Sequence, residues 1–359
     1  MYRTRKVLRR QLHVRYPAEG ATIVLRTELD WDHDLEPASV SDDGTCFTFA
    51  LEAARPFLRF KPCLRRGAEL HWAVGADMLV VMTHEGGRDV YPGFFTSASG
   101  SFAPLLEIDS AILGRSHRVR VYLPAGYDEN PLQRHPVLYM QDGRNLFFPD
   151  ESFSGREWQV DESLALLDGM NALDELVVVG IHSGDRSLDY TQPGYEPYGR
   201  SLVEELKPEI DRRFRLRPGR DYTGVMGSSL GGVVSFFLAW QWPEVFGHAA
   251  CLSSTFSHRD DLVERVLSEP RRPCKFYLDS GWPGDNFETT LAMALALSRA
   301  GYEYGRDFLH LAFPLAGHDE GAWAERLHVP LQLFYGRLGT AARRDTLLPG
   351  RPPPSVLGS

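Results

Sequence analysis

The sequence predicts an α/β fold whose mostly parallel sheet is covered by helices on both faces, preceded by a small all-β, immunoglobulin-like sandwich domain. Three observations predict it. Residues 1–95 hold short runs in which apolar and polar side chains alternate, with turn residues between them, as in the strands of a sandwich. Residues 105–339 hold unbroken apolar runs separated by helical stretches, which is typical of parallel strands buried on both faces. A glycine-rich turn at residues 227–231 joins one such strand directly to a helix.

The first domain, residues 1–95, is expected to be the β-sandwich. Its alternating runs predict strands at 11–16, 22–27, 46–51, 57–63 and 78–82. Trp31 and Trp72 could stack on a sugar ring, but tryptophans in a sandwich of this size more often pack in the core. Packing is therefore the favoured interpretation, and carbohydrate binding is the alternative.

The rest of the chain divides into three parts. Small residues at 96–104 predict a linker, residues 105–339 the catalytic α/β domain, and the proline-rich residues 340–359 a tail without a fold of its own. The strands expected in the α/β domain are 118–123, 137–141, 176–181, 222–226, 249–252, 276–278 and 308–313. The expected helices lie near 158–168, 199–214, 230–241, 259–268, 286–300 and 321–338.

The composition limits the partners. The formal net charge is −9 at pH 7, and nucleic-acid binding needs clustered cations, so we expect no such partner. No apolar run is long enough to span a bilayer, and no apolar segment of a secretory signal follows the basic start. We therefore expect a cytoplasmic protein without membrane contact. No Cys/His cluster indicates a metal, and free buried thiols are expected at Cys46, Cys63, Cys251 and Cys274.

The turn Gly227-Ser-Ser-Leu-Gly231 has the pattern of a nucleophile elbow. A turn this sharp needs glycines on either side because a Cβ there would block the approach of helix to strand. Ser229 at its centre would expose its hydroxyl at the carboxyl end of the sheet, beside the N-terminus of a helix. The alternative, an ordinary glycine-rich turn, is less favoured because strand, turn and helix occur in register.

A serine hydroxyl becomes a good nucleophile only when a base accepts its proton, so Ser229 needs a histidine. His318 fits, because it lies in a loop after the strand that ends near residue 313 and before a helix. His258, His310 and His328 are weaker candidates, since His310 falls within an expected strand and His328 within an expected helix.

The histidine in turn needs a carboxylate that fixes its tautomer. The strand near residues 276–278 is followed by two, Asp279 at its end and Asp285 in the loop beyond. We favour Asp285, because Asp279 could equally brace the turn.

The oxyanion of an acyl-transfer intermediate needs two backbone N–H donors held in place. One is expected from Leu230, directly after the nucleophile. The other is expected from the loop at 142–147, where Gly143 permits a tight turn and Arg144 would point its N–H inward.

In these motifs the chain resembles the Putative esterase family of α/β-hydrolases, which includes enterochelin and other siderophore esterases, feruloyl esterases, S-formylglutathione hydrolases and mycolyltransferases. The resemblance covers about 105–338, and the N-terminal sandwich resembles modules of enterochelin esterases and of starch- and glycogen-active enzymes. Asp189 stands where the family has Glu, Ala316 where it has Gly, and the acid loop is one residue longer. The matching stretches are Tyr122-Leu-Pro-Ala-Gly-Tyr127, Asp142-Gly-Arg-Asn-Leu-Phe147, Arg186-Ser-Leu-Asp-Tyr190, Gly227-Ser-Ser-Leu-Gly-Gly232, Gly281-Trp-Pro-Gly-Asp285 and Ala316-Gly-His-Asp319.

The resemblance implies a serine carboxylic-ester hydrolase that works through an acyl-enzyme and uses no cofactor. It implies a small-molecule ester substrate, either siderophore-like, aryl (feruloyl-type) or a sugar ester, which Trp158, Arg186 and Trp282 are expected to bind. The alternatives are an acyltransferase with the same acyl-enzyme and a non-catalytic carbohydrate-binding protein on a hydrolase scaffold. Whether the protein forms a homo-oligomer is left open.

Overall fold

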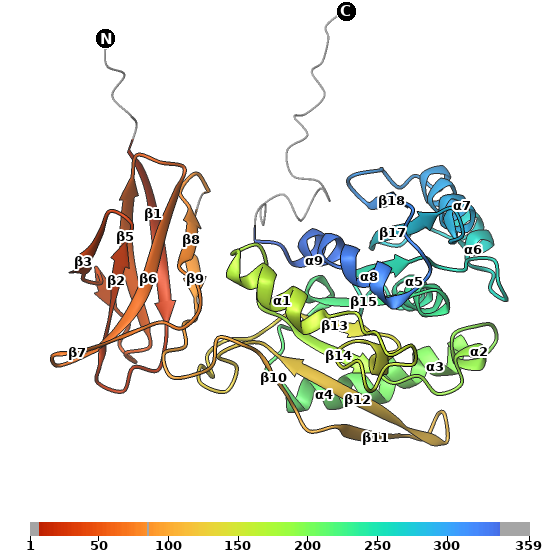
Figure 1. Ribbon diagram of the computed structural model, residues 1–359, viewed down its shortest axis with the longest axis horizontal. Coiled ribbons are helices and arrows are strands. Elements are labelled where there is room, and N and C mark those ends of the chain that lie inside the picture. The colour runs from red at the N-terminus through yellow and green to blue at the C-terminus, as the bar shows by residue number, and fades with distance from the viewer. Residues whose placement is uncertain (1–6, 85, 338–359) are drawn as a thin grey trace, which may run out of the picture. The chain divides into compact units, whose positions relative to one another are not determined.

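The computed structural model describes residues 7–84 and 86–337, and contacts within the chain divide it into two compact units (Figure 1). The first unit ends at Ser101 and also includes residues 124–134 and 169–171. The second consists of 102–123, 135–168 and the chain from Ala172 onward. The domain boundaries expected at residues 95 and 105 stay predictions, and the expected tail at 340–359 lies outside the described residues.

The first unit is built from two sheets. Their order is β4-β5-β1-β9 in one and β3-β2-β6-β7 in the other, with β8 paired to β6. Inward side chains of both sheets, among them Leu12, Phe49, Ile23 and Phe60, form one buried apolar cluster, which is the core of a β-sandwich. The strands are β1(Leu8–Arg15), β2(Thr22–Thr27), β3(Asp30–Leu35), β4(Ser39–Val40), β5(Cys46–Ala53), β6(Phe57–Arg66), β7(Glu69–Trp72), β8(Met78–Val81) and β9(Arg88–Val90).

The two tryptophans of this unit lie outside its core cluster, which corrects the favoured expectation that they pack there. Their ring centroids are 6.4 Å apart, and the Arg26 guanidinium lies over the Trp72 ring. Trp72 is paired with Cys63 across β6 and β7, and Cys63 is fully buried although it faces away from the core. Carbohydrate binding by Trp31 and Trp72 stays a prediction.

The second unit is organised around a nine-stranded sheet that is mixed, whereas the sequence predicted a mostly parallel one. Strands β14-β13-β15-β16-β17-β18 pair in parallel, but β12 is antiparallel to both β11 and β14. Exposed and buried residues alternate along most of β12, as in antiparallel strands with one solvated face. The strands are β10(Ser101–Phe102), β11(Leu106–Ser110), β12(Arg115–Leu123), β13(Val137–Met140), β14(Val177–Ile181), β15(Thr223–Ser228), β16(His248–Leu252), β17(Lys275–Trp282) and β18(Phe308–Pro314).

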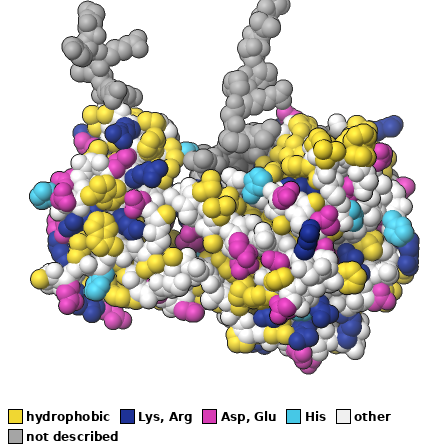
Figure 2. Space-filling model, viewed as in Figure 1, with side chains coloured by type: hydrophobic (Ala, Val, Ile, Leu, Met, Phe, Trp, Pro, Cys, Tyr) yellow, Lys and Arg dark blue, Asp and Glu magenta, His cyan; other side chains and the backbone are white. Residues whose placement is uncertain are grey.

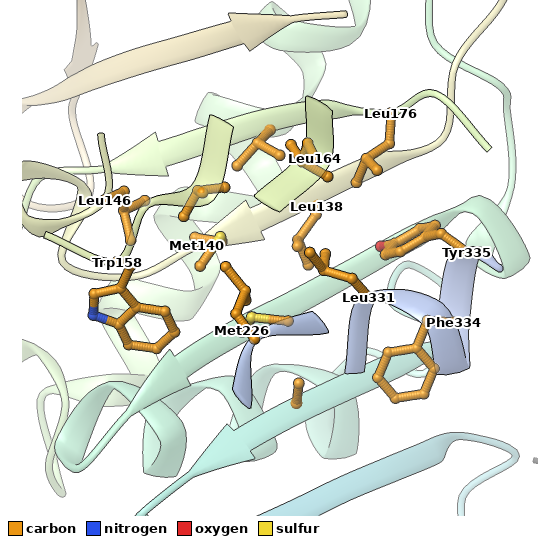
Figure 3. Packing of buried hydrophobic residues seen from close by; sticks show 14 of the residues in the cluster. Leu138, Met140, Leu146, Trp158, Leu164, Leu176, Met226, Leu331, Phe334 and Tyr335 are labelled. Carbon is orange, nitrogen blue, oxygen red and sulfur yellow. The ribbon is translucent and has the colours of Figure 1, made fainter. Parts of the chain in front are cut away.

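Helices cover both faces of this sheet. On one face, Leu138, Met140 and Met226 of β13 and β15 pack with residues of α1(Val160–Gly169) and α9(His328–Tyr335), as Figure 3 shows. On the other face, Phe276 of β17 stacks on Phe236 of α5(Leu230–Gln241) with ring centroids 4.5 Å apart. Because neighbouring residues of a strand point to opposite faces, each central strand is buried on both sides.

The remaining helical elements connect these strands. The single helix expected near 199–214 is three consecutive elements, α3, η2 and α4. Their bounds, with those of the other elements, are η1(Gly143–Asn145), α2(Arg186–Asp189), α3(Tyr195–Ser201), η2(Leu202–Leu206), α4(Lys207–Arg213), η3(Arg220–Tyr222), α6(Leu262–Ser268), α7(Phe287–Arg299) and α8(Glu320–Arg326).

The described surface carries charges of both signs (Figure 2), and the cysteines form no disulfide. On the face drawn in Figure 2, basic and acidic side chains are interspersed over the described residues. Within residues 7–84 and 86–337, no helix has both the length and the apolar character needed to cross a bilayer. All four cysteines are free thiols, and Cys63, Cys251 and Cys274 are buried as expected, but Cys46 is only half-buried, which corrects the expectation for that residue.

Two buried histidines predict that the second unit loses stability in acid. Burial lowers the pKa of His117 and of His135 to about 4, so both stay neutral where the unfolded chain, with a histidine pKa near 6.5, binds protons. The stability they contribute is complete above about pH 6.5 and is lost as the pH falls toward 4, at a cost of about 2 kcal/mol each at pH 5. We expect His117→Gln to flatten the decrease of the denaturant midpoint between pH 7 and pH 5. The exposed His328, changed to Gln, is the control, and equal slopes for the two variants would contradict the prediction.

Candidate active site

Four strained residues mark one edge of the nine-stranded sheet. Asp142, Ser229, Ser253 and Leu315 have φ of 56°, 55°, 45° and 68° and follow the carboxyl ends of β13, β15, β16 and β18. Positive φ is unfavourable for residues with a Cβ and persists only where the surroundings enforce it, which is common at functional sites. In α/β sheets, ligands bind outside the carboxyl ends of the parallel strands. The candidate site therefore lies at this edge.

Ser229 occupies a sharp turn between β15 and α5. Its backbone has φ 55° and ψ −124°, and its N–H donates to the carbonyl of Leu252, 2.9 Å away at the end of the neighbouring strand β16. A Cβ at Gly227 would lie 2.5 Å from the backbone of Gly231, so only glycine permits this approach of helix to strand. The strand, turn and helix of the predicted elbow are thus present in the expected order.

The two expected oxyanion donors lie in neighbouring turns. Leu230 is the first residue of α5, where a helix leaves N–H groups without an acceptor of its own. Arg144 is in the 3-10 turn η1, which can pack on β14 because a Cβ at Gly143 would meet the backbone of Gly180 at 2.5 Å. A Cβ at Gly231 would be 3.0 Å from Asp142 Oδ2, so the start of α5 and the turn after β13 are in contact.

Asp285 and His318, from the loops after β17 and β18, are joined by a hydrogen bond of 2.7 Å between Oδ1 and Nδ1. The carboxylate is fully buried and also accepts hydrogen bonds from the Ser253 hydroxyl at 2.5 Å and from the N–H groups of Gly281 and Asn286 at 2.6 and 2.8 Å. Four donors occupy the four acceptor positions of a carboxylate, so Asp285 has no place for a proton. Nδ1 of His318 must therefore carry the hydrogen, which leaves Nε2 as the acceptor in the neutral ring.

The same contacts set the charge of Asp285. Burial by itself raises the pKa of a carboxyl group. At Asp285 the hydrogen bonds from His318, Ser253, Gly281 and Asn286 outweigh burial, and the pKa lies well below its ordinary value. The group is an anion throughout the neutral range.

Asp279, the other candidate acid, points to a different partner. Its Oδ1 is 3.2 Å from Nε of Arg326 on α8, and its Oδ2 accepts from the Tyr277 hydroxyl at 2.8 Å. Both members of this ion pair are buried. Burial raises the pKa of Asp279 to about 6, against the lowering effect of Arg326. His318 is thus held by Asp285, and Asp279 by Arg326.

Two of the weaker histidine candidates, His310 and His328, form hydrogen bonds with other residues. His310 Nε2 is 3.0 Å from the Thr290 hydroxyl, and His328 Nδ1 is 3.1 Å from the Glu325 carbonyl. His258 lies in the loop between β16 and α6.

Three residues of the site were not predicted from the sequence. Ser253 lies between β16 and the loop of Asp285, and Trp323 and Arg326 on α8 both reach its hydroxyl, at 3.0 and 2.5 Å. The rings of His318 and Trp323 also make a T-shaped contact, with centroids 5.1 Å apart. A serine after a strand has no local signature, but an arginine eight residues after the histidine, in the expected helix, was an available signal.

The residues expected to bind substrate have different environments. Trp158 is only 2% exposed, packs in the core cluster and meets Trp323 at 5.5 Å, so the structure gives it a packing role and corrects that expectation. Arg186 pairs with Asp142, Nε to Oδ1 at 2.8 Å, and thereby braces the turn that contains Arg144. Trp282 is 53% exposed at the end of β17, and its carbonyl accepts the N–H of Leu315.

Several known proteins are similar to this chain, each over a different share of its length. YbbA of Bacillus subtilis (strain 168), an uncharacterised protein, is 27% identical over 163 residues, which are 44% of this chain and 64% of that protein. The chain spans less than two thirds of the length of the first curated relatives that it matches.

Among solved structures, a ferulic acid esterase has a TM-score of 0.56 at 18% identity, covering 66% of this chain and 98% of that one. The enterobactin esterase FES from Shigella flexneri, in the presence of enterobactin, has a TM-score of 0.55 at 17% identity and covers 93% of this chain and 94% of its own. At these identities the likeness shows a shared fold.

The family assignment comes from the sequence as a whole. The model of the family described as Putative esterase matches residues 110–332, more than half of the chain. This match includes the Ser229 elbow, Asp285 and His318, and it confirms the resemblance that the motifs predicted. The chain therefore belongs to the Putative esterase family.

Proposed function

We propose that the protein is a serine carboxylic-ester hydrolase with Ser229 as nucleophile, His318 as base and Asp285 as the acid that orients the base. The observation on which this depends is the 2.7 Å hydrogen bond between a saturated, buried Asp285 and His318 Nδ1. It leaves Nε2 of His318 to accept a proton, at the same sheet edge as the strained turn of Ser229.

In the acylation step, His318 Nε2 takes the proton of the Ser229 hydroxyl as the oxygen attacks the ester carbonyl. The imidazolium that forms is stabilised by the buried anion of Asp285. The N–H groups of Leu230 and Arg144 donate to the oxyanion, and the positive end of the α5 dipole favours the same charge. His318 then gives its proton to the departing alcohol, which leaves an acyl group on Ser229.

In the second step, water takes the place of the alcohol. His318 accepts a proton from the water as its oxygen attacks the acyl carbonyl, and Ser229 regains its hydrogen when the acid departs. Each proton moves between Ser229, His318 and the reactants, so the two steps balance with these residues and water alone.

The surroundings of His318 favour an ester with a flat or apolar acyl group. Trp282 and Leu315 are 53% and 87% exposed and are linked by a backbone hydrogen bond of 2.6 Å, so together they present an apolar surface beside the loops of Asp285 and His318. A tryptophan can stack on a sugar ring as well as on an aromatic one, but an acetyl group offers it no ring, whereas the acyl group of an aryl ester does. We infer that aryl esters, feruloyl-type or siderophore-like, suit this surface better than sugar acetates.

The proposal predicts that the purified protein hydrolyses p-nitrophenyl acetate or butyrate and is labelled on Ser229 by a fluorophosphonate. A panel of feruloyl, siderophore-like and acetyl-sugar esters, compared by kcat/KM, then ranks the substrate classes. Absence of both turnover and labelling would contradict the proposed function. If an added alcohol yields a new ester faster than water yields the acid, the enzyme is an acyltransferase with the same acyl-enzyme.

A further inference from the structure

The hydrogen-bond direction at Ser253 is determined by its neighbours. A serine hydroxyl has one hydrogen to donate and two lone pairs to accept with. The indole N–H of Trp323 and the guanidinium of Arg326 can only donate, and both lie on Ser253 Oγ, at 3.0 and 2.5 Å. The hydroxyl hydrogen must therefore point to its third neighbour, Asp285 Oδ2, at 2.5 Å.

The backbone of Ser253 is fixed as firmly as its side chain. Its N–H donates to the carbonyl of Asp279 at 2.8 Å, and its carbonyl accepts from the side-chain amide of Asn286 at 2.7 Å. Asn286 is the residue after Asp285, so Ser253 contacts the acid loop both through the hydroxyl and through the carbonyl. These contacts account for a non-glycine residue with φ of 45° at a fully buried position.

We propose that Ser253 is a positioning residue for the reaction, whose hydroxyl, oriented by Trp323 and Arg326, holds Asp285 so that its Oδ1 faces Nδ1 of His318. The inference depends on the proposed function, since it assigns Asp285 the role of the acid. Ser253 touches no substrate and acts only through Asp285.

Charge balance explains why the orienting cation is an arginine. Arg326 is 2% exposed, and its guanidinium lies between the carboxylates of Asp279 and Asp285, with Nε 3.2 Å from the first and a terminal nitrogen 3.6 Å from the second. Two buried carboxylates without this cation would repel each other and compete for a proton. A forked guanidinium can pair with Asp279 and still donate to Ser253, which a single ammonium group does less well.

The test compares Ser253→Ala with Ser254→Ala. Both serines are fully buried and adjacent, but within the described chain the Ser254 hydroxyl has no hydrogen-bond partner, so each variant loses one oxygen and only one loses the contact to Asp285. For Ser253→Ala we expect kcat on p-nitrophenyl butyrate to fall on the order of tenfold, with little change in KM, because a hydrogen bond to a charged group is lost. Ser254→Ala is expected to keep the wild-type kcat.

A second measurement needs no substrate. The His318 Nδ1 hydrogen that bonds to Asp285 should give a far-downfield proton NMR signal in the wild-type protein. We expect the signal to move upfield or vanish by exchange in Ser253→Ala and to persist in Ser254→Ala. Should Ser253→Ala fail to fold, Trp323→Phe, which removes one donor and keeps an aromatic ring beside His318, is expected to weaken the same signal.

The outcomes separate this inference from the proposed function. If the wild-type enzyme is neither active nor labelled, the function fails, whatever the NMR signal does. If the wild-type enzyme is active but Ser253→Ala matches Ser254→Ala in both kcat and the downfield signal, the positioning role is overturned.

Discussion

Replacing Ser229 by alanine is expected to lower kcat/KM for ester substrates at least about a thousandfold and to leave the fold intact. The variant loses the attacking oxygen, so only binding and oxyanion stabilisation remain to accelerate attack by water. Fluorophosphonate labelling should disappear with the activity. The measurement is initial rates on p-nitrophenyl butyrate, with circular dichroism and a denaturation curve to compare the folds.

The adjacent serine provides the control. Ser228 lies at the end of β15 with its side chain buried, so Ser228→Ala should keep the labelling that Ser229→Ala loses. Ser229→Gly is a second inactive variant, and we expect it to be at least as stable as Ser229→Ala because glycine adopts φ of 55° without strain. Equal turnover by Ser229→Ala and the wild-type enzyme would refute the nucleophile.

Replacing Asp285 by asparagine is expected to lower kcat about 10⁴-fold, the effect known for the corresponding change in a serine protease. An amide cannot accept four hydrogen bonds, and its NH₂ would face donors on every side. To bond with it, His318 would turn to the tautomer that keeps its hydrogen on Nε2, the atom that must accept the proton of Ser229. The measurement is kcat and KM of the variant across pH 5–9.

Asp279→Asn is the matched comparison, since it makes the same chemical change at a buried carboxylate six residues earlier. It disrupts the ion pair with Arg326, so we expect lower stability but a kcat that stays within about tenfold of the wild-type value. The reverse ranking of the two variants would move the acid to Asp279.

The site residues that the sequence predicted well are those whose structural requirements involve only a few neighbouring residues in the chain. The turn of Ser229 needs glycines at 227 and 231, and this spacing can be recognised directly in the sequence. Asp285 and His318 each follow an apolar strand in the order that the nucleophile demands, and the structure places them in hydrogen-bond contact. Their roles in catalysis stay predictions until the variants are measured.

What the sequence did not reveal depends on contacts between distant segments. Ser253 looks like any loop serine, and only the folded chain brings Trp323 and Arg326, some seventy positions later, onto its hydroxyl. Strand β3, Asp30–Leu35, lacks an apolar alternation because it is an edge strand with mostly exposed side chains, and it was not expected. The sequence alone could not distinguish the environments of Trp158 and Trp282. Only the structure shows that the first is buried in the core and the second is exposed.

The position of β18 in the sheet has a consequence for how the protein would lose activity on denaturation. This strand lies at the end of the strand order, and within the described residues β17 is the only strand paired with it. The chain directly after β18 supplies His318, Trp323 and Arg326. An outermost strand can detach in a partial opening that costs less free energy than global unfolding. Such fraying would separate His318 from Asp285 while the central strands stay paired. If His318 and Asp285 act as proposed, activity is expected to be lost under mild denaturing conditions before most of the secondary structure unfolds.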